Sequence, residues 1–325
     1  MTVPSKKIYS IQMLRGIAAL SVVIAHSSHK ISQMGVENTF GFSFLGFGVD
    51  IFFIVSGFVM MYITDRNGTA VNNDYLRLVS SFIKDRVIRI IPLYWFFTLL
   101  SLCVFLVLPD MVNSSGGGTG IIQSFLLLPV PTGTKFLIQN GWTLTYEFLF
   151  YIPFAALMLS GKYQKIIGVI LFFVLIDILS GIWQSDNFAS YSIKYEFVLG
   201  MAIYLFYTGK LYQSLTVAIV AFFLAYLNAG DQGRVFHEGI AAFIVVLIAV
   251  SSEKFLLKVI FYLRPLIFLG DISYSLYLSH PFILQGISVI FKRLHFNMLG
   301  IFLYCIMITF SILLGYLCLS FWKEI

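Results

Sequence analysis

Charged residues are scarce in this sequence of 325 residues. Asp, Glu, Lys and Arg together make up 11% of the chain, whereas hydrophobic residues make up 59%. That leaves too little polar surface to cover a soluble globular protein of this size. The composition therefore excludes a soluble protein and predicts one that is embedded in a lipid bilayer.

Cysteines and cofactor motifs are few as well. Cys103, Cys305 and Cys318 all lie in apolar stretches, so they indicate neither a disulfide framework nor a metal site. No group of His, Cys and Asp residues has the spacing of zinc ligands, and no phosphate-binding loop or dinucleotide glycine fingerprint is present. We therefore expect no metal and no permanently bound cofactor. Because there is also no internal repeat and no appended soluble domain, we predict one transmembrane domain over residues 1–325.

What the sequence has instead is a series of apolar runs about 20 residues long, the length that crosses a bilayer as a helix. The runs are continuous rather than alternating, which favours helices over an outer-membrane barrel. We predict an all-α, polytopic bundle of about ten transmembrane helices. Their approximate bounds are 8–29, 43–64, 88–109, 141–159, 165–183, 191–207, 212–228, 236–250, 265–291 and 297–321.

The Lys and Arg residues predict the orientation, because they collect on the cytoplasmic side of membrane proteins. With the N-terminus inside, most of the 21 Lys and Arg residues fall on that side. Both termini are then cytoplasmic, and the chain crosses the cytoplasmic (inner) membrane several times. This distribution explains the net charge of +6 without a nucleic-acid partner. The basic residues predicted outside are Lys30, Lys135, Lys194, Arg234, Lys292 and Arg293.

The first apolar run contains two ionisable residues, in the segment LRGIAALSVVIAH from Leu14 to His26. At about 100° per residue, the helix path from Arg15 to His26 ends about 20° beyond three full turns, so the two share one face and lie about 16 Å apart. Ionisable groups are costly at membrane depth, which makes each a candidate functional residue. The alternative is that Arg15 snorkels to the inner interface and that His26 is a satisfied interfacial histidine.

Two carboxylates are predicted at the depth of His26. Asp50 in GFGVDIFFIVSGF and Glu147 in GWTLTYEFLFY each lie about two turns inward from the outer end of a helix. A carboxylate beside an imidazole fixes its tautomer and favours its protonated form, as a general base requires. We therefore predict a catalytic group of His26, Glu147 and Asp50. The alternative is a buried polar network that only joins helices.

Arginines gather toward the predicted cytoplasmic end. Arg86 and Arg89 lie three residues apart where the connection 65–87 meets the third run, so they lie on one side of a helix. Together with Arg15 they could bind phosphate groups, which guanidinium recognises through paired hydrogen bonds. The alternative is that Arg86, like Lys84, is an ordinary positive-inside flanking charge.

A second histidine, His280, precedes Pro281 in the ninth run. A helix adjustment at this proline could free backbone groups to bind a ligand, or the histidine could only pack between helices, so its role is left open. Asp177, Glu196 and Asp271 are isolated or near a helix end, and we assign them no role in the site.

Five segments, in chain order, resemble the membrane acyltransferase 3 family, the bacterial O-acetyltransferases of cell-surface polysaccharides. They are LRGIAALSVVIAH, GVDIFFIVSGF, RVIRIIPLYW, WTLTYEFLFY and ISYSLYLSHPF. The opening IQMLRGIAAL is most similar to the stand-alone exopolysaccharide acetyltransferases of that group.

The resemblance implies a function for several of these residues. The family's essential Arg and His of the first helix correspond to Arg15 and His26, its paired cytoplasmic arginines to Arg86 and Arg89, and the Glu of its fourth-helix motif to Glu147. It implies acetyl-CoA or another acyl-CoA as the donor on the cytoplasmic side and a sugar hydroxyl as the acceptor. Some relatives carry an extra hydrolase-like domain outside the membrane. Without one, this chain is expected to acylate its acceptor directly or through separate polysaccharide-assembly proteins.

The sequence therefore predicts an integral membrane O-acyltransferase. Two other classes use the same residues differently. In a transporter or flippase for a polysaccharide precursor, the ionisable residues form a proton or substrate path, although the missing inverted repeat and broken helices count against it. In a scaffold of a polysaccharide-assembly complex, they would have no catalytic role.

Overall fold

A computed structural model of the chain describes residues 7–36, 42–67, 75–113, 117–131, 133–182, 191–228, 233–294 and 300–323. These residues are mostly helical, and their β-structure is limited to an isolated bridge between Thr119 and Lys135. The predicted all-α class is thus confirmed for the described part of the chain. Five of its helices are long and apolar enough to cross a membrane, namely Tyr9–Gln33, Leu45–Asp65, Tyr75–Val107, Lys162–Ser180 and Gly300–Phe321.

The expected ten spans are therefore supported only in part. Each predicted run contains helix, but in half of them the helix is short, interrupted or less apolar. The ninth run is divided at Ile272 into α12 (Arg264–Asp271) and α13 (Ser273–Leu294). The third run is longer than predicted, because α3 (Tyr75–Val107) begins inside the connection 65–87.

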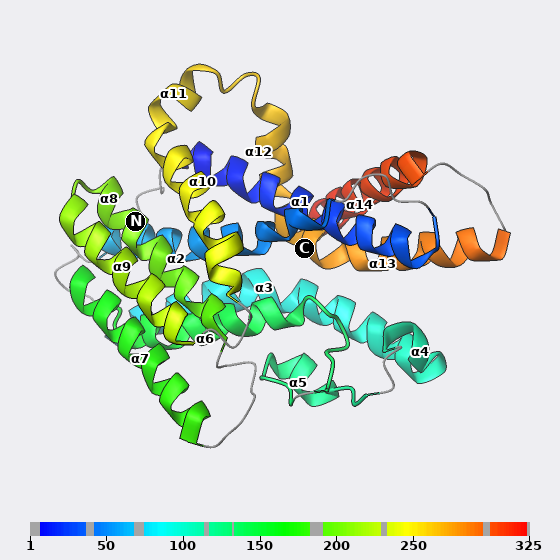
Figure 1. Cartoon of the computed structure of the whole chain (residues 1–325), viewed down its shortest axis with the longest axis horizontal. Coiled ribbons are helices and arrows are strands. Elements are labelled where there is room, and N and C mark those ends of the chain that lie inside the picture. Colours follow the sequence, from blue (N-terminus) through cyan, green and yellow to red (C-terminus); the bar gives the residue numbers. More distant parts are fainter. Residues whose placement is uncertain are drawn as a thin grey trace. The chain divides into compact units, whose positions relative to one another are not determined.

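The chain packs into two compact units (Figure 1). The first unit consists of Met1–Phe52 and Ala241–Ile325 and the second of Phe53–Ile240. The first contains α1 (Tyr9–Gln33), η1 (Phe42–Phe47), the start of α2 (Gly48–Asn67), α10 (Ile240–Ser251), α11 (Glu253–Lys258), α12, α13 and α14 (Gly300–Lys323). The second contains the rest of α2, α3, α4 (Pro109–Val112), α5 (Ile121–Leu126), α6 (Gly141–Ala156), α7 (Lys162–Ile182), η3 (Ser192–Lys194), α8 (Tyr195–Tyr207), α9 (Leu211–Leu227) and η5 (Val235–Gly239).

In the first unit, α1 packs on α12, α13 and α14. Glycines bring its backbone against α12: a Cβ on Gly16 would lie 2.4 Å from the Leu266 carbonyl oxygen, and one on Gly270 would lie 1.9 Å from that of Gln12. Small residues allow such close approach between membrane helices, where dispersion and polar contacts replace the hydrophobic effect. Gly16, directly after Arg15, thus sets how near this part of α1 comes to α12.

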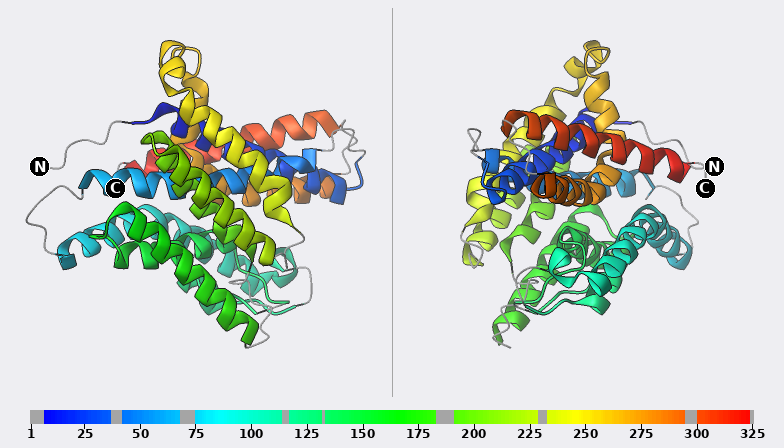
Figure 2. Two further views of the ribbon diagram at one scale, coloured as in Figure 1. Left: turned by 60° about the vertical axis from the view of Figure 1, so that its left-hand side comes forward. Right: turned by 90° about the vertical axis from the view of Figure 1, so that its right-hand side faces the viewer.

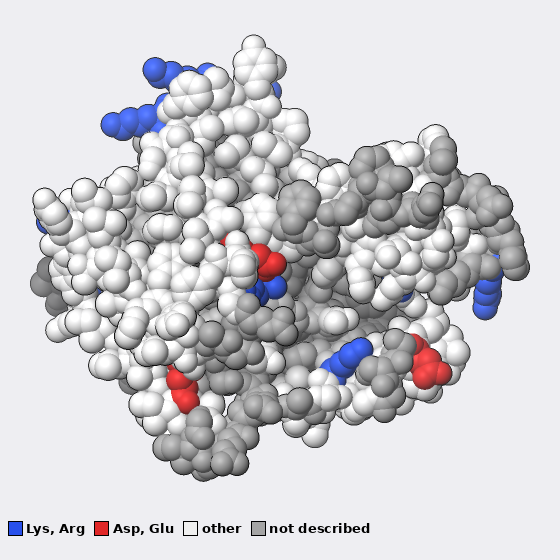
Figure 3. All heavy atoms as spheres, viewed as in Figure 1, with Lys and Arg blue, Asp and Glu red and all other residues white. Residues whose placement is uncertain are grey.

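Polar contacts close the predicted cytoplasmic end of the first unit. The Glu253 carboxylate accepts hydrogen bonds from the backbone nitrogens of Tyr9 (3.0 Å) and Ser10 (2.8 Å), two of the unpaired donors at the start of α1. The Asp271 carboxylate contacts the Lys7 ammonium at 3.0 Å and the Gln12 side-chain amide at 2.7 Å. Basic side chains gather over α11, which carries Lys254 and Lys258, whereas most of the described surface in view is uncharged (Figure 3).

In the second unit, α2 and α8 also meet through glycines. A Cβ on Gly57 would lie 2.0 Å from the Phe197 carbonyl oxygen, and one on Gly200 would lie 1.9 Å from that of Ile54. Phe197 stacks on Phe150 of α6 with ring centres 4.4 Å apart. Helices α8 and α9 lie side by side (Figure 2).

Helices α3 and α6 of the second unit run in opposite directions. The Tyr75 hydroxyl, at the start of α3, donates to the Ala156 carbonyl at the end of α6, at 3.0 Å. Further along α3, the Tyr94 hydroxyl donates to the Ser124 carbonyl of α5 at 2.7 Å, and this hydroxyl lies next to Gly141, the first residue of α6. The apolar fragment after residue 120, which is too short to cross a membrane, is thereby anchored to α3.

We expect Gly270→Ala to destabilise the protein by about 1–3 kcal/mol, because the new methyl group forces α1 and α12 apart. The midpoint of thermal unfolding in detergent should fall by several degrees. The control is Gly286→Ala in α13, where an added Cβ meets no atom within 4 Å. That variant should match the wild type or gain about 0.5–1 kcal/mol from the removal of a helical glycine. Equal midpoints for both variants would contradict the proposed close contact.

Candidate active site

The first unit contains a pair of histidines. His26 of α1 and His280 of α13 approach with 2.9 Å between Nδ1 of His26 and Nε2 of His280, and their ring centres are 5.1 Å apart. His280 is fully buried, whereas the His26 side chain is exposed. The residue whose role the sequence left open is thus the hydrogen-bond partner of the predicted catalytic histidine.

The hydrogen bonds of His280 determine which nitrogen of each neutral ring carries the proton. Nδ1 of His280 lies 3.2 Å from the Leu276 carbonyl oxygen, which can only accept, so Nδ1 is protonated and Nε2 is not. Nε2 of His280 then accepts a hydrogen bond from Nδ1 of His26. The remaining nitrogen of His26, Nε2, therefore bears a lone pair. Reactive histidines commonly have a second group that hydrogen-bonds one ring nitrogen and so fixes the tautomer.

Other polar contacts join α1 to the same helices. The Arg15 guanidinium donates from Nη2 to the Ser273 hydroxyl at 2.9 Å, and the Lys30 ammonium contacts the Gln285 side-chain oxygen at 2.5 Å. The predicted common face of Arg15 and His26 is thus observed, since both side chains have partners on α13. Asp50 is fully buried at the start of α2, in the same unit. Its predicted role as a partner of His26 stays a prediction.

The second unit contains the other predicted site residues, which gather around one tyrosine. The Tyr151 hydroxyl donates to the Glu147 carboxylate, which also accepts from the Ser56 hydroxyl at 3.4 Å. Tyr151 lies close enough to Arg86 and Arg89 to interact electrostatically with both. Arg86, Arg89 and Glu147 are thus brought together within this unit, and Tyr151 is a residue that sequence reasoning missed. Its signal was the four-residue spacing from Glu147, which places both on one helix face.

The structure corrects the predicted location of the arginines. Arg86 and Arg89 do not lie where a loop meets a helix, because α3 already begins at Tyr75, about three turns earlier. The Arg86 guanidinium carbon lies 5.7 Å from the centre of the Phe82 ring, which contacts the Tyr151 ring at 5.9 Å. Nε of Arg86 is buried without a hydrogen-bond partner among the described residues. This environment differs from that of an ordinary flanking charge at a membrane surface.

In the described ranges, no group of three or more His, Cys, Asp or Glu residues could hold a metal ion. The first unit therefore offers an imidazole of defined tautomer. The second unit, taken by itself, offers a cluster of arginines, glutamate and tyrosine. These groups suit proton transfer and anion binding.

A chain whose described residues are mostly helical, with five helices long and apolar enough to cross a membrane, is a multi-pass membrane protein. It matches the acyltransferase domain family over residues 8–319 and belongs to that family. Among curated proteins it is similar to the exopolysaccharide production protein ExoZ of Rhizobium meliloti (strain 1021), with 29% identity over 280 residues. The match covers 81% of this chain and 82% of the relative. No solved structure matches the chain. Family membership favours acyl transfer over the transporter and scaffold alternatives.

We expect the His26 imidazole, in its neutral form, to carry its proton on Nδ1. Nitrogen NMR of histidine-labelled protein, at a pH where both rings are neutral, distinguishes the two tautomers. His280→Gln should retain this tautomer, because the amide oxygen can accept the same hydrogen bond, whereas His280→Leu should release His26 to a mixture of tautomers. An unchanged His26 spectrum in His280→Leu would contradict the assignment.

Proposed function

We propose that the protein transfers an acyl group, most simply acetyl, from acyl-CoA to a hydroxyl of a cell-surface or lipid-linked exopolysaccharide. The observation that carries this proposal is the His26–His280 hydrogen bond, which leaves Nε2 of His26 with a lone pair. Family membership and the similarity to ExoZ, named as an exopolysaccharide production protein, support acyl transfer and a glycan acceptor.

In the proposed reaction, Nε2 of His26 accepts the proton of the sugar hydroxyl as its oxygen attacks the thioester carbonyl carbon. The tetrahedral intermediate then collapses with cleavage of the carbon–sulfur bond. The CoA sulfur leaves and takes the proton from His26, so the products are an O-acyl sugar and CoA. His280 touches no reacting atom in this scheme. It is a positioning residue that keeps the His26 proton on Nδ1.

Arginines are proposed to hold the donor. CoA carries several phosphate groups, and guanidinium binds phosphate through paired, charge-assisted hydrogen bonds. The buried Nε of Arg86 supports this role, since it has no hydrogen-bond partner among the described residues and could donate to a ligand. On the sequence pattern, Arg89 and Arg15 are proposed as further donor-binding residues, and Glu147 and Asp50 are proposed as further catalytic residues.

The proposed location is the cytoplasmic (inner) membrane, with both termini in the cytoplasm. CoA would then enter from the side where most Lys and Arg residues are predicted. The acceptor would be presented from the other side, directly or by polysaccharide-assembly proteins.

Acyl transfer by the purified protein, measured as CoA release from acetyl-CoA in the presence of the host exopolysaccharide, tests the catalytic assignment. We expect His26→Ala to lower the rate at least 10²-fold, as for loss of a general base, and His280→Leu to lower it about 10- to 100-fold. His280→Gln should recover part of the loss. The control is Gln285→Ala, which removes the neighbouring contact between α1 and α13 without touching His26.

Two results would contradict this mechanism. Activity that survives His26→Ala would exclude His26 as the base. An acyl group trapped on His26 after incubation with labelled acetyl-CoA alone would replace direct transfer with an acyl-histidine intermediate.

A measurement of CoA binding distinguishes a phosphate-binding role of Arg86 from the role of an ordinary flanking charge. We expect Arg86→Gln to weaken the binding of CoA about tenfold, equivalent to the loss of about 1.4 kcal/mol. Lys84→Gln is the matched control, because Lys84 is an exposed cation two residues away on the same helix. Titration calorimetry of both variants with CoA measures the effect. Equal weakening by both would show that Arg86 acts only through the general positive charge of this region.

A further inference from the structure

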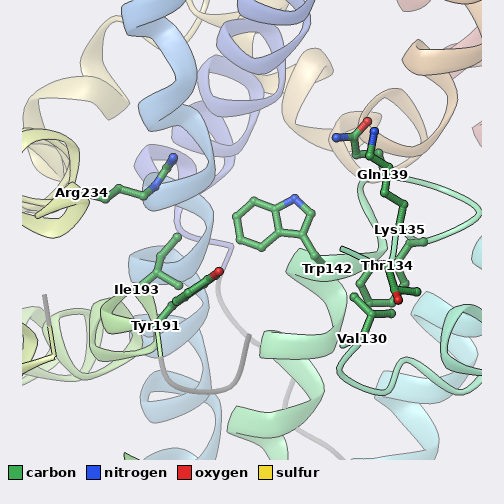
Figure 4. Close-up of a pocket in the computed structure, with 9 residues that line it drawn as sticks. Val130, Thr134, Lys135, Gln139, Trp142, Tyr191, Ile193 and Arg234 are labelled. Carbon is green, nitrogen blue, oxygen red and sulfur yellow. The ribbon is translucent and has the colours of Figure 1, made fainter. Parts of the chain in front are cut away.

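A pocket of about 360 Å³ lies in the second unit, apart from the arginine and glutamate cluster. Its walls come from three parts of the chain that are distant in sequence: the loop before α6 with Trp142, the segment that leads into η3, and Arg234 before η5. All three lie at helix ends that the orientation of the chain predicts to be outside. The lining side chains that carry the argument are Thr134, Lys135, Gln139, Trp142, Tyr191 and Arg234 (Figure 4).

The loop before α6 is held in place by its backbone. Lys135 donates from its backbone nitrogen to the Gly118 carbonyl and accepts from the Gly120 nitrogen, both at 2.9 Å. Two residues later, the Leu137 nitrogen donates to the Ser124 hydroxyl at 2.9 Å, and the Leu137 carbonyl accepts from Ser101 of α3 at 2.6 Å. The Lys135 side chain therefore projects from a fixed loop, which lowers the ordering cost of binding a ligand.

The opposite wall is fixed by a buried ion pair. The Lys194 side chain is fully buried, and its ammonium contacts the Asp177 carboxylate at 2.5 Å and the Tyr191 carbonyl at 2.9 Å. Tyr195 and Asn228 donate to the other oxygen of Asp177. A buried pair is maintained only when further hydrogen bonds satisfy both charges, as they do here. Asp177, which the sequence left without a role, thus belongs to the network that positions Tyr191.

The lining combines positive charge with aromatic faces. Lys135 and Arg234 supply cations on opposite sides of Trp142 (Figure 4). The Arg234 guanidinium is oriented by Glu238, with 2.9 Å between Nη2 and Oε2. Trp142 and Tyr191 offer apolar faces that also carry polar tips, and Gln139 and Thr134 add hydrogen-bonding groups. A small inorganic anion would be bound by Lys135 and Arg234 alone, and an apolar ligand by the rings of Trp142 and Tyr191 alone.

We propose that this pocket binds an acidic sugar residue of the acceptor polysaccharide. The carboxylate of a uronic acid would be bound by Lys135, its ring would pack on Trp142, and its hydroxyls would reach Gln139 and Thr134, whereas Arg234 adds positive charge from the other side of Trp142. This inference rests on the proposed function in one respect, that the acceptor is a glycan. It adds that the acceptor is anionic and that this pocket selects it.

The test uses a tetrasaccharide that contains one glucuronic acid and the same tetrasaccharide with its carboxyl group reduced to an alcohol. Binding to the purified full-length protein, in nanodiscs of zwitterionic lipid, is measured by calorimetry without any acyl donor. We expect the acidic probe to bind about tenfold more tightly than the reduced one, and Lys135→Gln to remove most of this difference. Trp142→Ala should weaken both probes.

The matched control is Arg293→Ala, which removes an exposed cation, also predicted outside, from α13 of the first unit. It should leave both affinities unchanged. Thermal unfolding of each variant identifies any that fail to fold, and Lys135→Arg, which keeps the charge, should retain the preference.

Several outcomes would overturn the proposal. They are equal binding of the two probes, an equal loss of preference in Arg293→Ala, and binding of inorganic phosphate as tight as that of the acidic tetrasaccharide. Because no acyl donor is present, this result is separate from the proposed reaction. Selective binding of the acidic probe without acyl transfer would support the proposed pocket and contradict the proposed enzyme activity. Acyl transfer at a rate that depends neither on the carboxylate nor on Lys135 would support the enzyme activity and contradict the proposed pocket.

Discussion

Polar side chains in apolar helices must find their partners inside the protein, because lipid offers none. This constraint accounts for the polar contacts that join α1 to its neighbours in the first unit, from Gln12 with Asp271 to Lys30 with Gln285. It accounts equally for the buried pair of Lys194 and Asp177 in the second unit. Glycines at helix contacts help polar side chains to find these partners, since they bring backbones close enough for short side chains to meet.

The same constraint gives the candidate site its chemistry. A histidine in water exchanges freely between tautomers, but His280 is buried and has the Leu276 carbonyl and the His26 imidazole among its partners. Its proton position is therefore set by its surroundings, and it sets that of His26 in turn. A contact that joins two helices thus also fixes the proton position of the imidazole proposed as the base. A role in joining helices is therefore compatible with the proposed role in positioning the base.

Helical periodicity was a reliable guide where a single helix decided the outcome. It correctly placed Arg15 and His26 on one face, which the contacts of both with α13 confirm. It was less reliable at helix ends: Arg86 and Arg89 were assigned to a loop boundary, whereas α3 starts at Tyr75. The cause is the charged segment before the apolar run, which hydropathy alone reads as a loop although its residues can form a helix.

The sequence by itself determined the class of protein, the helical content and the face shared by Arg15 and His26, because composition and a period of 3.6 residues depend only on neighbours along the chain. Its order of motifs also identified the family. Only the tertiary structure decided that His280 is the partner of His26, that Ser56 contacts Glu147, and that three distant segments line one pocket. Those contacts join residues far apart in the chain, and a local pattern along the sequence does not specify such pairs.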